Sequence, residues 1–328
     1  MAGLFTSVQT LAGPLIASEA FGRLSKITFL GILSPRYRSL PDFPFGRPGS
    51  ADDGDRADHS LGVASIVGQM VSRLGLSAHA QLYAAAWSLI HDIATWPLSH
   101  TGEAGFGRIT GQSSRSLRTA MVEGADWLPR RLKVYAPLKE LKIEHDVLLA
   151  LFEKNQAGLT GEFCIMQKLI HSPITPDTLE GMARSGQTFG ISVPSTSTLI
   201  AALYRDVFSD VMIDRRASNQ ILQFWRAKSE IYDRHINRSR SIEFESIWSS
   251  AIENAFHRTS LVDSLDLSER NIIHQVLIGG LPHFRGIRKY KHPLSYVIVP
   301  ELSGKKQLKE NVRVDDLEKL LVKRERQL

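Results

Sequence analysis

The stretch Trp87-Ser-Leu-Ile-His-Asp-Ile-Ala-Thr-Trp-Pro-Leu-Ser-His100 places a histidine directly beside an aspartate, His91-Asp92, after an apolar run. An earlier stretch, His59-Ser-Leu-Gly-Val-Ala64, opens another apolar run with a histidine. Adjacent side chains on a helix diverge by about 100°, so His91 and Asp92 reach one ion only if the helix end points at it. Imidazole and carboxylate ligands suit zinc, iron or manganese, and less often magnesium.

The composition is that of an ordinary soluble globular protein. The chain has 328 residues, 43% of them hydrophobic and 23% charged, so it can bury a sizeable core as one large domain or as a domain with an appended half. Cys164 is the only cysteine, which excludes an intrachain disulfide and a cysteine-based metal cluster. A single cysteine fits a reducing cytosol.

Charge and hydropathy point to a cytoplasmic protein with anionic partners. The start, Met1-Ala-Gly-Leu-Phe5, lacks the basic residues that open a secretory signal. No uncharged apolar run approaches the roughly 18 residues of a membrane span, so we expect no membrane contact. The net charge of +6 and the pI near 9.4 favour phosphate esters or nucleic acid as partners. The alternative is simple solubility, because part of the charge lies in tails and loops.

Apolar residues recur at helical spacing through most of the chain, which predicts an all-α fold. Gly75 and Ser77 mark a helix stop and a fresh N-cap between the first two helices. The expected helices cover residues 61–74, 78–90, 144–153, 161–170, 198–212, 216–236, 242–256 and 269–278.

Several segments interrupt this pattern. Residues 34–58, rich in proline and carrying Asp52-Asp-Gly-Asp55, predict a long loop. His292–Pro300 is enriched in β-branched and aromatic residues and predicts one short strand or hairpin arm. Residues 314–328 are read as a charged amphipathic helix or a frayed tail. A change of character near 192–197 divides the chain into regions 1–190 and 191–328.

Four ordered segments carry a resemblance to a known family. They are the two histidine stretches, the upstream Phe21-Gly-Arg-Leu-Ser-Lys-Ile27 and the downstream Asp177-Thr-Leu-Glu-Gly-Met-Ala-Arg184. Together they resemble the HD-domain metal-dependent phosphohydrolases, and most of all the deoxynucleoside triphosphate triphosphohydrolase branch. The likeness covers residues 15–190. It implies an HD-domain helical bundle over 1–190, with a mostly helical C-terminal region over 191–328 packed on it.

The resemblance implies a metal site made of His59, His91, Asp92 and Asp177. Taken singly, a buried histidine is usually a core residue and an aspartate is often a helix cap, so the set and its flanks carry the argument. The implied cofactor is one divalent ion: manganese, iron, zinc, cobalt or magnesium. Such an ion polarises a phosphoryl oxygen or lowers the pKa of bound water to about 7.

His100 and Glu103 are the catalytic candidates. His100 follows Pro97 and so leaves the helix of His91; in the family this position faces the substrate phosphate and exchanges a proton, a role that a pKa near 6.5 suits. The alternative for His100 is a histidine that supports a metal ligand or neighbours an N-cap. Glu103 either orients the His100 imidazole or caps a helix start at Ser99 or His100.

Arg56 and Arg23 are the candidates for binding the substrate phosphate. In the resembling branch the position of Arg56 binds phosphate, which a guanidinium fork does well; the alternative is a surface ion pair with Asp55 or Asp58. Arg23 and Lys26, three residues apart, add phosphate contacts or merely solvate a helix face.

The chain departs from the triphosphohydrolase pattern at several positions. Gln112–Arg118 holds no histidine where the branch usually has one, and Thr95 replaces another. Thr178, Gly181 and Ser185 stand where a lysine, a tyrosine and a second aspartate often grip the triphosphate and sugar. The metal site is therefore expected to be intact, while monophosphates, cyclic or oligomeric nucleotides and other phosphate esters remain open as substrates.

Two further features leave alternatives open. His145 and His171 lie between His100 and Asp177. Other HD branches, including mixed-valence di-iron oxygenases, hold a second metal with two extra histidines, and the first of these has no counterpart here. The alternative is a surface histidine for His145 and a helix-terminal histidine for His171. Basic and aromatic residues gather in the C-terminal half as a candidate nucleic-acid surface, or as core aromatics beside a solvated face. These segments are Phe224–Lys228, Arg234–Arg240 and Phe284–Lys291.

The sequence thus predicts an enzyme that hydrolyses a phosphate ester with a metal, most of all a nucleotide. The alternative from another class is a non-catalytic HD-fold nucleotide sensor or nucleic-acid-binding protein, and a di-iron oxygenase ranks behind both. A homo-oligomer is left open.

Overall fold

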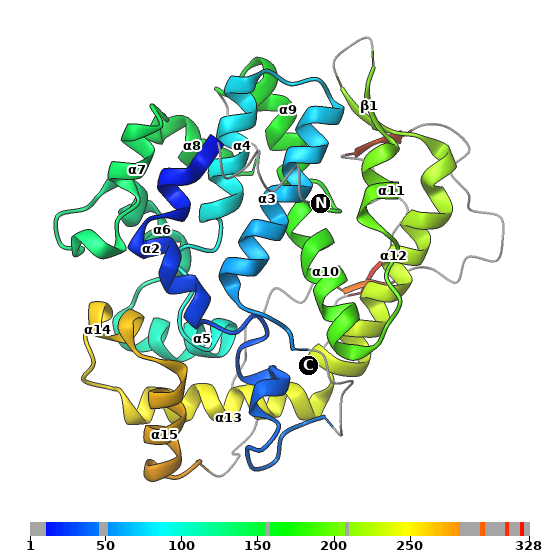
Figure 1. The fold of residues 1–328 in the computed structure, drawn as a ribbon. Helices are drawn as coiled ribbons and strands as arrows, with labels where there is room; N and C mark the ends of the chain where they lie inside the picture. The colour runs from blue at the N-terminus through cyan, green and yellow to red at the C-terminus, as the bar shows by residue number, and fades with distance from the viewer. Residues whose placement is uncertain are drawn as a thin grey trace.

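The computed structural model describes residues 11–45, 52–154, 158–206, 210–282, 296–298, 312–314 and 322–324. These residues form a mostly α-helical protein with short strands, as the sequence predicts (Figure 1). The helices, in chain order, are α2 (Glu19–Gly22), α3 (Arg56–Arg73), α4 (Ala78–Ile90), α5 (Ser99–Thr110), α6 (Ser114–Glu123), α7 (Tyr135–Glu140), α8 (His145–Leu151), α9 (Gly161–Ile170), α10 (Pro176–Phe189), α11 (Thr196–Ala201), α12 (Ser218–Ile231), α13 (Ser239–Ala255), α14 (Leu261–Asp266) and α15 (Glu269–Gly279).

Capping residues set where the central helices begin and end. Asp55 caps α3 by accepting a hydrogen bond from a backbone N–H of the first turn, and Ser77 does the same for α4. Between them Gly75 adopts a φ of +65°, which glycine accepts without strain and which reverses the chain. Thr175 caps α10, and Pro176 occupies its first turn, where a missing N–H costs nothing.

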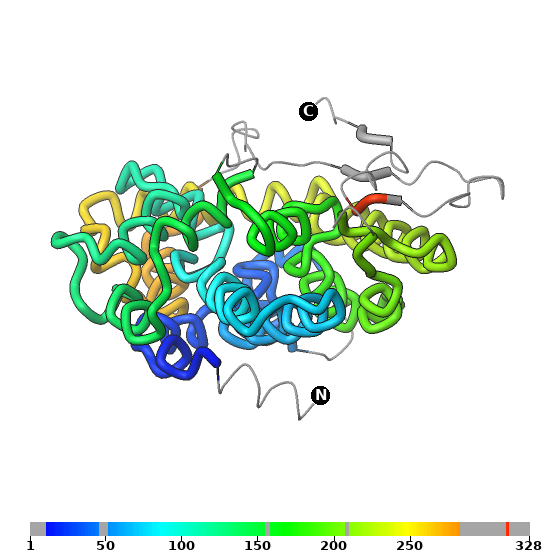
Figure 2. The backbone as a smooth tube through the Cα atoms, turned by 90° about the horizontal axis from the view of Figure 1, so that it is seen from above, coloured from blue at the N-terminus to red at the C-terminus, as the bar shows by residue number. Residues whose placement is uncertain are grey.

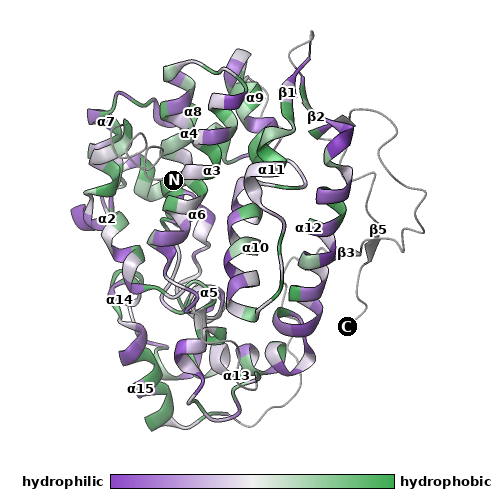
Figure 3. Cartoon of the chain, turned by 45° about the vertical axis from the view of Figure 1, so that its right-hand side comes forward, coloured by the Kyte–Doolittle hydropathy of each residue, from purple (hydrophilic) through white to green (hydrophobic). Residues whose placement is uncertain are grey.

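Helix α3 lies at the centre, packed against α4 on one side and α10 on the other (Figure 1). Hydrophilic and hydrophobic residues alternate along α10 and α12, as expected for helices that bury one stripe (Figure 3). The core is continuous across the molecule, and its largest fully buried side chains include Trp96, Trp225, Trp248, Tyr83 and Phe106. None of the helices in the described residues is long and apolar enough to cross a membrane.

The C-terminal region packs along the N-terminal one. Helix α12 contacts α10, and α13 contacts both α5 and α15. Figure 2 shows α2, in dark blue, and the orange helices α14 and α15 at the same end of the molecule. Thr28 also donates a hydrogen bond to Glu269 at the start of α15, so the two regions are in contact, and the division at 190 stays a prediction.

The short strands form two small sheets. Strands β1 (Leu203–Arg205), β2 (Val211–Ile213) and β4 (Val312–Arg313) make one sheet, and β3 (Tyr296–Ile298) pairs antiparallel with β5 (Val322–Arg324). The strand predicted within residues 292–300 is confirmed for its described part, 296–298.

Two secondary-structure predictions are wrong. The helix expected over 198–212 ends at Ala201, and the chain turns into the antiparallel pair of β1 and β2. Val211 and Ile213 are both buried there, which is the two-residue period of a strand. In a short apolar run, this period cannot be told from that of a helix by sequence alone. Where residues 314–328 are described, Val322–Arg324 forms a strand rather than a helix; the remainder, apart from Val314, lies outside the described residues.

Candidate metal centre

The predicted ligands come from the neighbouring ends of α3, α4 and α10. His59 lies in the first turn of α3, and His91 is the residue that ends α4. Because a short turn joins α3 to α4 and the two helices pack side by side, the start of one lies beside the end of the other. Asp92 follows in the turn after α4, and Asp177 lies in the first turn of α10.

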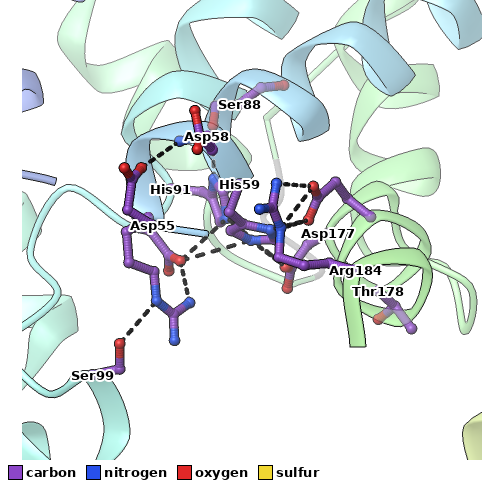
Figure 4. A network of polar contacts seen from close by, with 12 residues as sticks. Asp55, Asp58, His59, Ser88, His91, Ser99, Asp177, Thr178 and Arg184 are labelled. Atoms are coloured by element: carbon purple, nitrogen blue, oxygen red, sulfur yellow. Dashed lines mark hydrogen bonds and ion pairs between the residues drawn. The ribbon is translucent and has the colours of Figure 1, made fainter. Parts of the chain in front are cut away.

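Asp92 and Asp177 each place a carboxylate oxygen within 4 Å of both imidazole Nε2 atoms. His59 Nε2 and His91 Nε2 are 3.3 Å apart, and Asp92 Oδ2 lies 3.8 Å from the first and 3.7 Å from the second. Asp177 Oδ1 lies 3.0 Å from His59 Nε2 and 3.8 Å from His91 Nε2. Figure 4 shows the two rings pointing toward each other beside Asp177. Among the described residues, His59, His91 and Asp92 form a group that could hold a metal ion.

Both imidazoles are held in the tautomer that a metal ligand needs. His91 Nδ1 donates a hydrogen bond to the Ser88 carbonyl oxygen at 2.7 Å, and His59 Nδ1 bonds the Glu180 carboxylate. With Nδ1 engaged in this way, Nε2 is the ring nitrogen that a metal can bind, and both Nε2 atoms lie within 4 Å of the carboxylates of Asp92 and Asp177. This arrangement, with each ligand histidine fixed through its other nitrogen, fits a divalent transition metal.

Carboxylates dominate the surroundings of His59. Burial lowers the pKa of His59, but Asp177 and Glu180 outweigh burial and raise that pKa to about 9. The same carboxylates that attract a proton to His59 attract a divalent cation, which would take the place of that proton. His59 is fully buried, whereas the side chain of Asp177 is 52% exposed, so the site opens to solvent on the side of α10.

Glu180 is the functional residue that sequence reasoning missed. It lies three positions after Asp177 on α10, so the two face the same way, and this spacing was the available signal. Arg184 Nη2 holds the other side of its carboxylate at 2.5 Å. Burial raises the pKa of Glu180, but the bonds to His59 and Arg184 outweigh burial and lower it. A Cβ at Gly62 would lie 2.6 Å from Glu180 Oε1, so glycine makes room for this carboxylate.

Arg56 lies at the edge of the centre. Its side chain is 7% exposed, and Nη1 lies 2.6 Å from Asp92 Oδ2 rather than pairing with Asp55 or Asp58. Its Nε donates to Ser99 Oγ at 3.1 Å. Burial raises the pKa of Asp92, but Arg56 and the two histidines outweigh burial and hold that pKa well below its usual range. A charged guanidinium therefore sits next to the predicted metal ligands.

Arg23 is bonded to the backbone of the turn after Asp92 and does not face solvent, as a residue that binds a substrate phosphate would be expected to do. It is buried, and its two terminal nitrogens donate to the carbonyl oxygens of Ile93, at 2.6 Å, and Thr95, at 2.8 Å. These bonds hold the turn that follows Asp92. Burial lowers the pKa of Arg23 to about 10. A contact between Arg23 and phosphate stays a prediction.

His100 and Glu103 lie together on the first turns of α5. His100 Nδ1 is 3.7 Å from Glu103 Oε2, and Glu103 Oε1 accepts a hydrogen bond from Ser114 at 2.5 Å. The His100 side chain is 56% exposed, so it is accessible to a ligand. The N-cap of α5 is Leu98, without a side-chain cap bond, so Glu103 contacts His100 rather than capping the helix.

The remaining candidates lie apart from the centre. His145 packs its ring 4.6 Å from that of Tyr135, and His171 ends α9, with Nε2 3.0 Å from a carbonyl oxygen. Neither belongs to the histidine and aspartate group found in the described residues. Of the basic and aromatic segments, Phe224 and Trp225 are buried core residues, and 284–291 lies outside the described residues.

Comparison with known proteins shows the fold and not the family. No family model matches the chain, and no curated protein matches it. A phosphohydrolase from Bacteroides thetaiotaomicron superposes with a TM-score of 0.55 at 16% identity, over 74% of this chain and 54% of the other. A hypothetical protein from Aquifex aeolicus superposes with a TM-score of 0.60 at 18% identity, over 81% and 67% respectively. The chain therefore spans about half the length of the Bacteroides protein.

Proposed function

We propose that this protein is a metal-dependent hydrolase of phosphate esters of the HD-domain kind, with nucleotides as the first substrates to test. The observation that carries the proposal is the group formed by His59, His91 and Asp92, with the exposed Asp177 carboxylate beside both imidazole Nε2 atoms. The fold shared with a phosphohydrolase supports it. The resemblance to the triphosphohydrolase branch remains part of the proposal.

The chain's own residues supply the other requirements of phosphate hydrolysis. His59, His91, Asp92 and Asp177 would hold the ion, which supplies Lewis-acid activation of a phosphoryl oxygen or of water. Arg56, beside Asp92, is placed to bind a phosphoryl oxygen and to balance its charge. His100, kept near Glu103, is placed to give or take a proton.

The residues on α10 favour a substrate that is smaller than a nucleoside triphosphate. The Thr178 hydroxyl is engaged with Thr175 Oγ1 at 2.8 Å. A Cβ at Gly181 would already contact the Phe29 ring at 3.4 Å, and Ser185 is 1% exposed. Small residues packed against their neighbours thus stand where the resembling branch often has a lysine, a tyrosine and a second aspartate that grip the triphosphate and sugar. We infer that one phosphoryl group, bound by Arg56 and the ion, is the main recognition element.

A phosphate-release screen tests the proposal. Purified protein loaded with manganese, cobalt or magnesium would be incubated with nucleoside mono-, di- and triphosphates, cyclic nucleotides and simple phosphate esters. We expect release of inorganic phosphate or polyphosphate, or the ring-opened nucleoside monophosphate from a cyclic nucleotide, with at least one substrate, and none with His91→Ala. Release of intact tripolyphosphate from several deoxynucleoside triphosphates would show that the departures on α10 do not limit the substrate.

Two other results would replace the proposal. If no ester is hydrolysed with any of the metals while nucleotides or single-stranded nucleic acid still bind, the protein is a sensor or a binding protein. Two iron ions per chain by metal analysis would favour an oxygenase instead. Nucleic acid and a second copy of the chain stay predicted partners. Filter binding with the purified protein tests the first, and light scattering tests the second.

A further inference from the structure

The carboxylate of Glu269 lies inside the N-terminal region, although Glu269 is the first residue of α15. It is 6% exposed. Its Oε1 accepts three hydrogen bonds, from Thr28 N at 3.1 Å, Thr28 Oγ1 at 3.1 Å and Leu98 N at 2.7 Å. Its Oε2 accepts a hydrogen bond from the Tyr37 hydroxyl. One side chain from the C-terminal region therefore pairs with several buried donors of the N-terminal region. More than half of the chain lies between these donors and Glu269.

The turn that Glu269 holds has an unusual backbone. Leu98 and Ser99 both adopt left-handed conformations, with φ values of 62° and 51°. Non-glycine residues take this conformation only where the surroundings enforce it. Gly31 contributes to the enforcement, since a Cβ there would lie 2.3 Å from the Leu98 carbonyl oxygen. The turn separates the loop after Asp92 from the start of α5, so it sets the direction in which His100 points.

A chain of buried hydrogen bonds continues from this turn to the metal centre. Ser99 Oγ donates to the Thr28 carbonyl oxygen at 2.6 Å. Arg56 Nε donates to the same hydroxyl at 3.1 Å, and Arg56 Nη1 lies 2.6 Å from Asp92 Oδ2. Thr28 and Ser99 are each 1% exposed, so water does not substitute for a missing partner. Figure 4 shows Ser99 with the dashed line of its hydrogen bond near the metal centre.

We propose that Glu269 is a positioning residue that holds Arg56 and the first turn of α5 in place for phosphate binding at the metal centre. The inference rests on the proposed function in one respect only, namely that Arg56 contacts the phosphate. It assigns to the C-terminal region a direct part in building the site. Glu269 acts through hydrogen bonds rather than through its charge, because its oxygens face only N–H and O–H donors.

That reasoning separates two substitutions. Glu269→Ala removes every acceptor and leaves buried donors on Thr28 and Leu98 unpaired. Glu269→Gln retains the oxygen that accepts three hydrogen bonds, and its amide group can donate to the Tyr37 oxygen, which accepts as well as donates. The matched control is Glu253→Gln, which alters a C-terminal-region carboxylate that pairs with Arg108 on α5 and does not touch the turn.

The primary readout needs neither substrate nor metal. Hydrogen exchange of the Arg56 Nε–H, followed by NMR, reports whether its bond to Ser99 is kept. We expect exchange about tenfold faster in Glu269→Ala and wild-type rates in Glu269→Gln and Glu253→Gln. In manganese-loaded protein, Glu269→Ala should weaken inorganic phosphate binding and raise KM by about tenfold while manganese affinity stays unchanged. If Glu269→Ala does not fold, the milder Glu269→Asp shortens the same side chain by one methylene and draws its oxygens away from Thr28 and Leu98, so it should give the same results to a smaller degree.

Any other result contradicts either the positioning role of Glu269 or the proposed function, and the measurements show which of the two is wrong. Wild-type Arg56 exchange in folded Glu269→Ala would overturn the positioning role. Equal damage in Glu269→Gln and Glu269→Ala would overturn it too, because charge rather than hydrogen bonding would then matter. Faster exchange in Glu269→Ala, together with wild-type protein that binds no phosphate in any metal form, would uphold the positioning of Arg56 and refute the phosphate chemistry.

Discussion

Replacing Glu180 tests whether the convergence at His59 is a metal centre. Glu180 accepts the Nδ1–H of His59, and it holds Arg184 at 2.5 Å. In Glu180→Ala that N–H loses its partner and the imidazole is free to rotate or change tautomer, which would turn the Nε2 lone pair away from the ion. Partners of this kind typically contribute a factor of about 10–100 in metal affinity, which is about 1.4–2.7 kcal/mol.

The structure predicts a graded series. Glu180→Gln keeps an oxygen for the His59 Nδ1–H and loses only the charge, so it should cost about tenfold in affinity, whereas Glu180→Ala should approach about 100-fold. The free energy of unfolding should fall less in Glu180→Gln than in Glu180→Ala. The alanine variant leaves one buried donor unpaired, which costs about 1–3 kcal/mol. The matched control is Glu162→Gln, a carboxylate bonded to Ser77 away from the centre.

Isothermal titration of manganese into metal-stripped protein measures the affinities, and chemical denaturation measures stability. The reasoning is refuted if folded Glu180→Ala binds manganese as tightly as the wild type. It is also refuted if Glu162→Gln loses as much affinity as Glu180→Gln, because the effect would then be a general one of surface charge.

Three further predictions concern neighbouring residues. Asp92→Ala should abolish metal binding and hydrolysis, whereas His100→Ala should keep the metal and lose turnover; metal loss in the second variant, measured by elemental analysis, would make His100 a ligand. Gly62→Ala should lower metal affinity by about tenfold, because its Cβ would lie 2.6 Å from Glu180 Oε1; unchanged manganese titration would show that the carboxylate moves aside freely. Glu245 is buried, and burial raises its pKa from 4.5 to about 7, so the folded state binds this proton more tightly and loses stability as the pH rises from 4.5 to 7. Glu245→Gln should therefore stabilise the protein at pH 8 by up to about 3 kcal/mol and have no effect at pH 4, and equal shifts of the urea midpoint at both values would contradict this.

Much of the helical framework follows from local sequence, because caps and periodicity act over a few residues. Ser77, Gly75 and the apolar spacing of 78–90 predict α4 with its observed bounds. Strands β1 and β2 lie where a helix was predicted. Leu203 pairs with Ile213, and the partner of a strand lies outside any local window.

The four predicted ligands could be named from their order and flanks, since each segment carries its own residue types. What the sequence by itself determined was therefore a helical chain, and it named a candidate set of metal ligands. Only the tertiary structure decided that Glu180 fixes His59, that Arg56 pairs with Asp92, and that Arg23 holds a turn rather than facing open space. It alone brought Glu269 across 171 residues to Leu98. Such contacts depend on which helix faces pack together, and packing is set by the whole core rather than by any one segment.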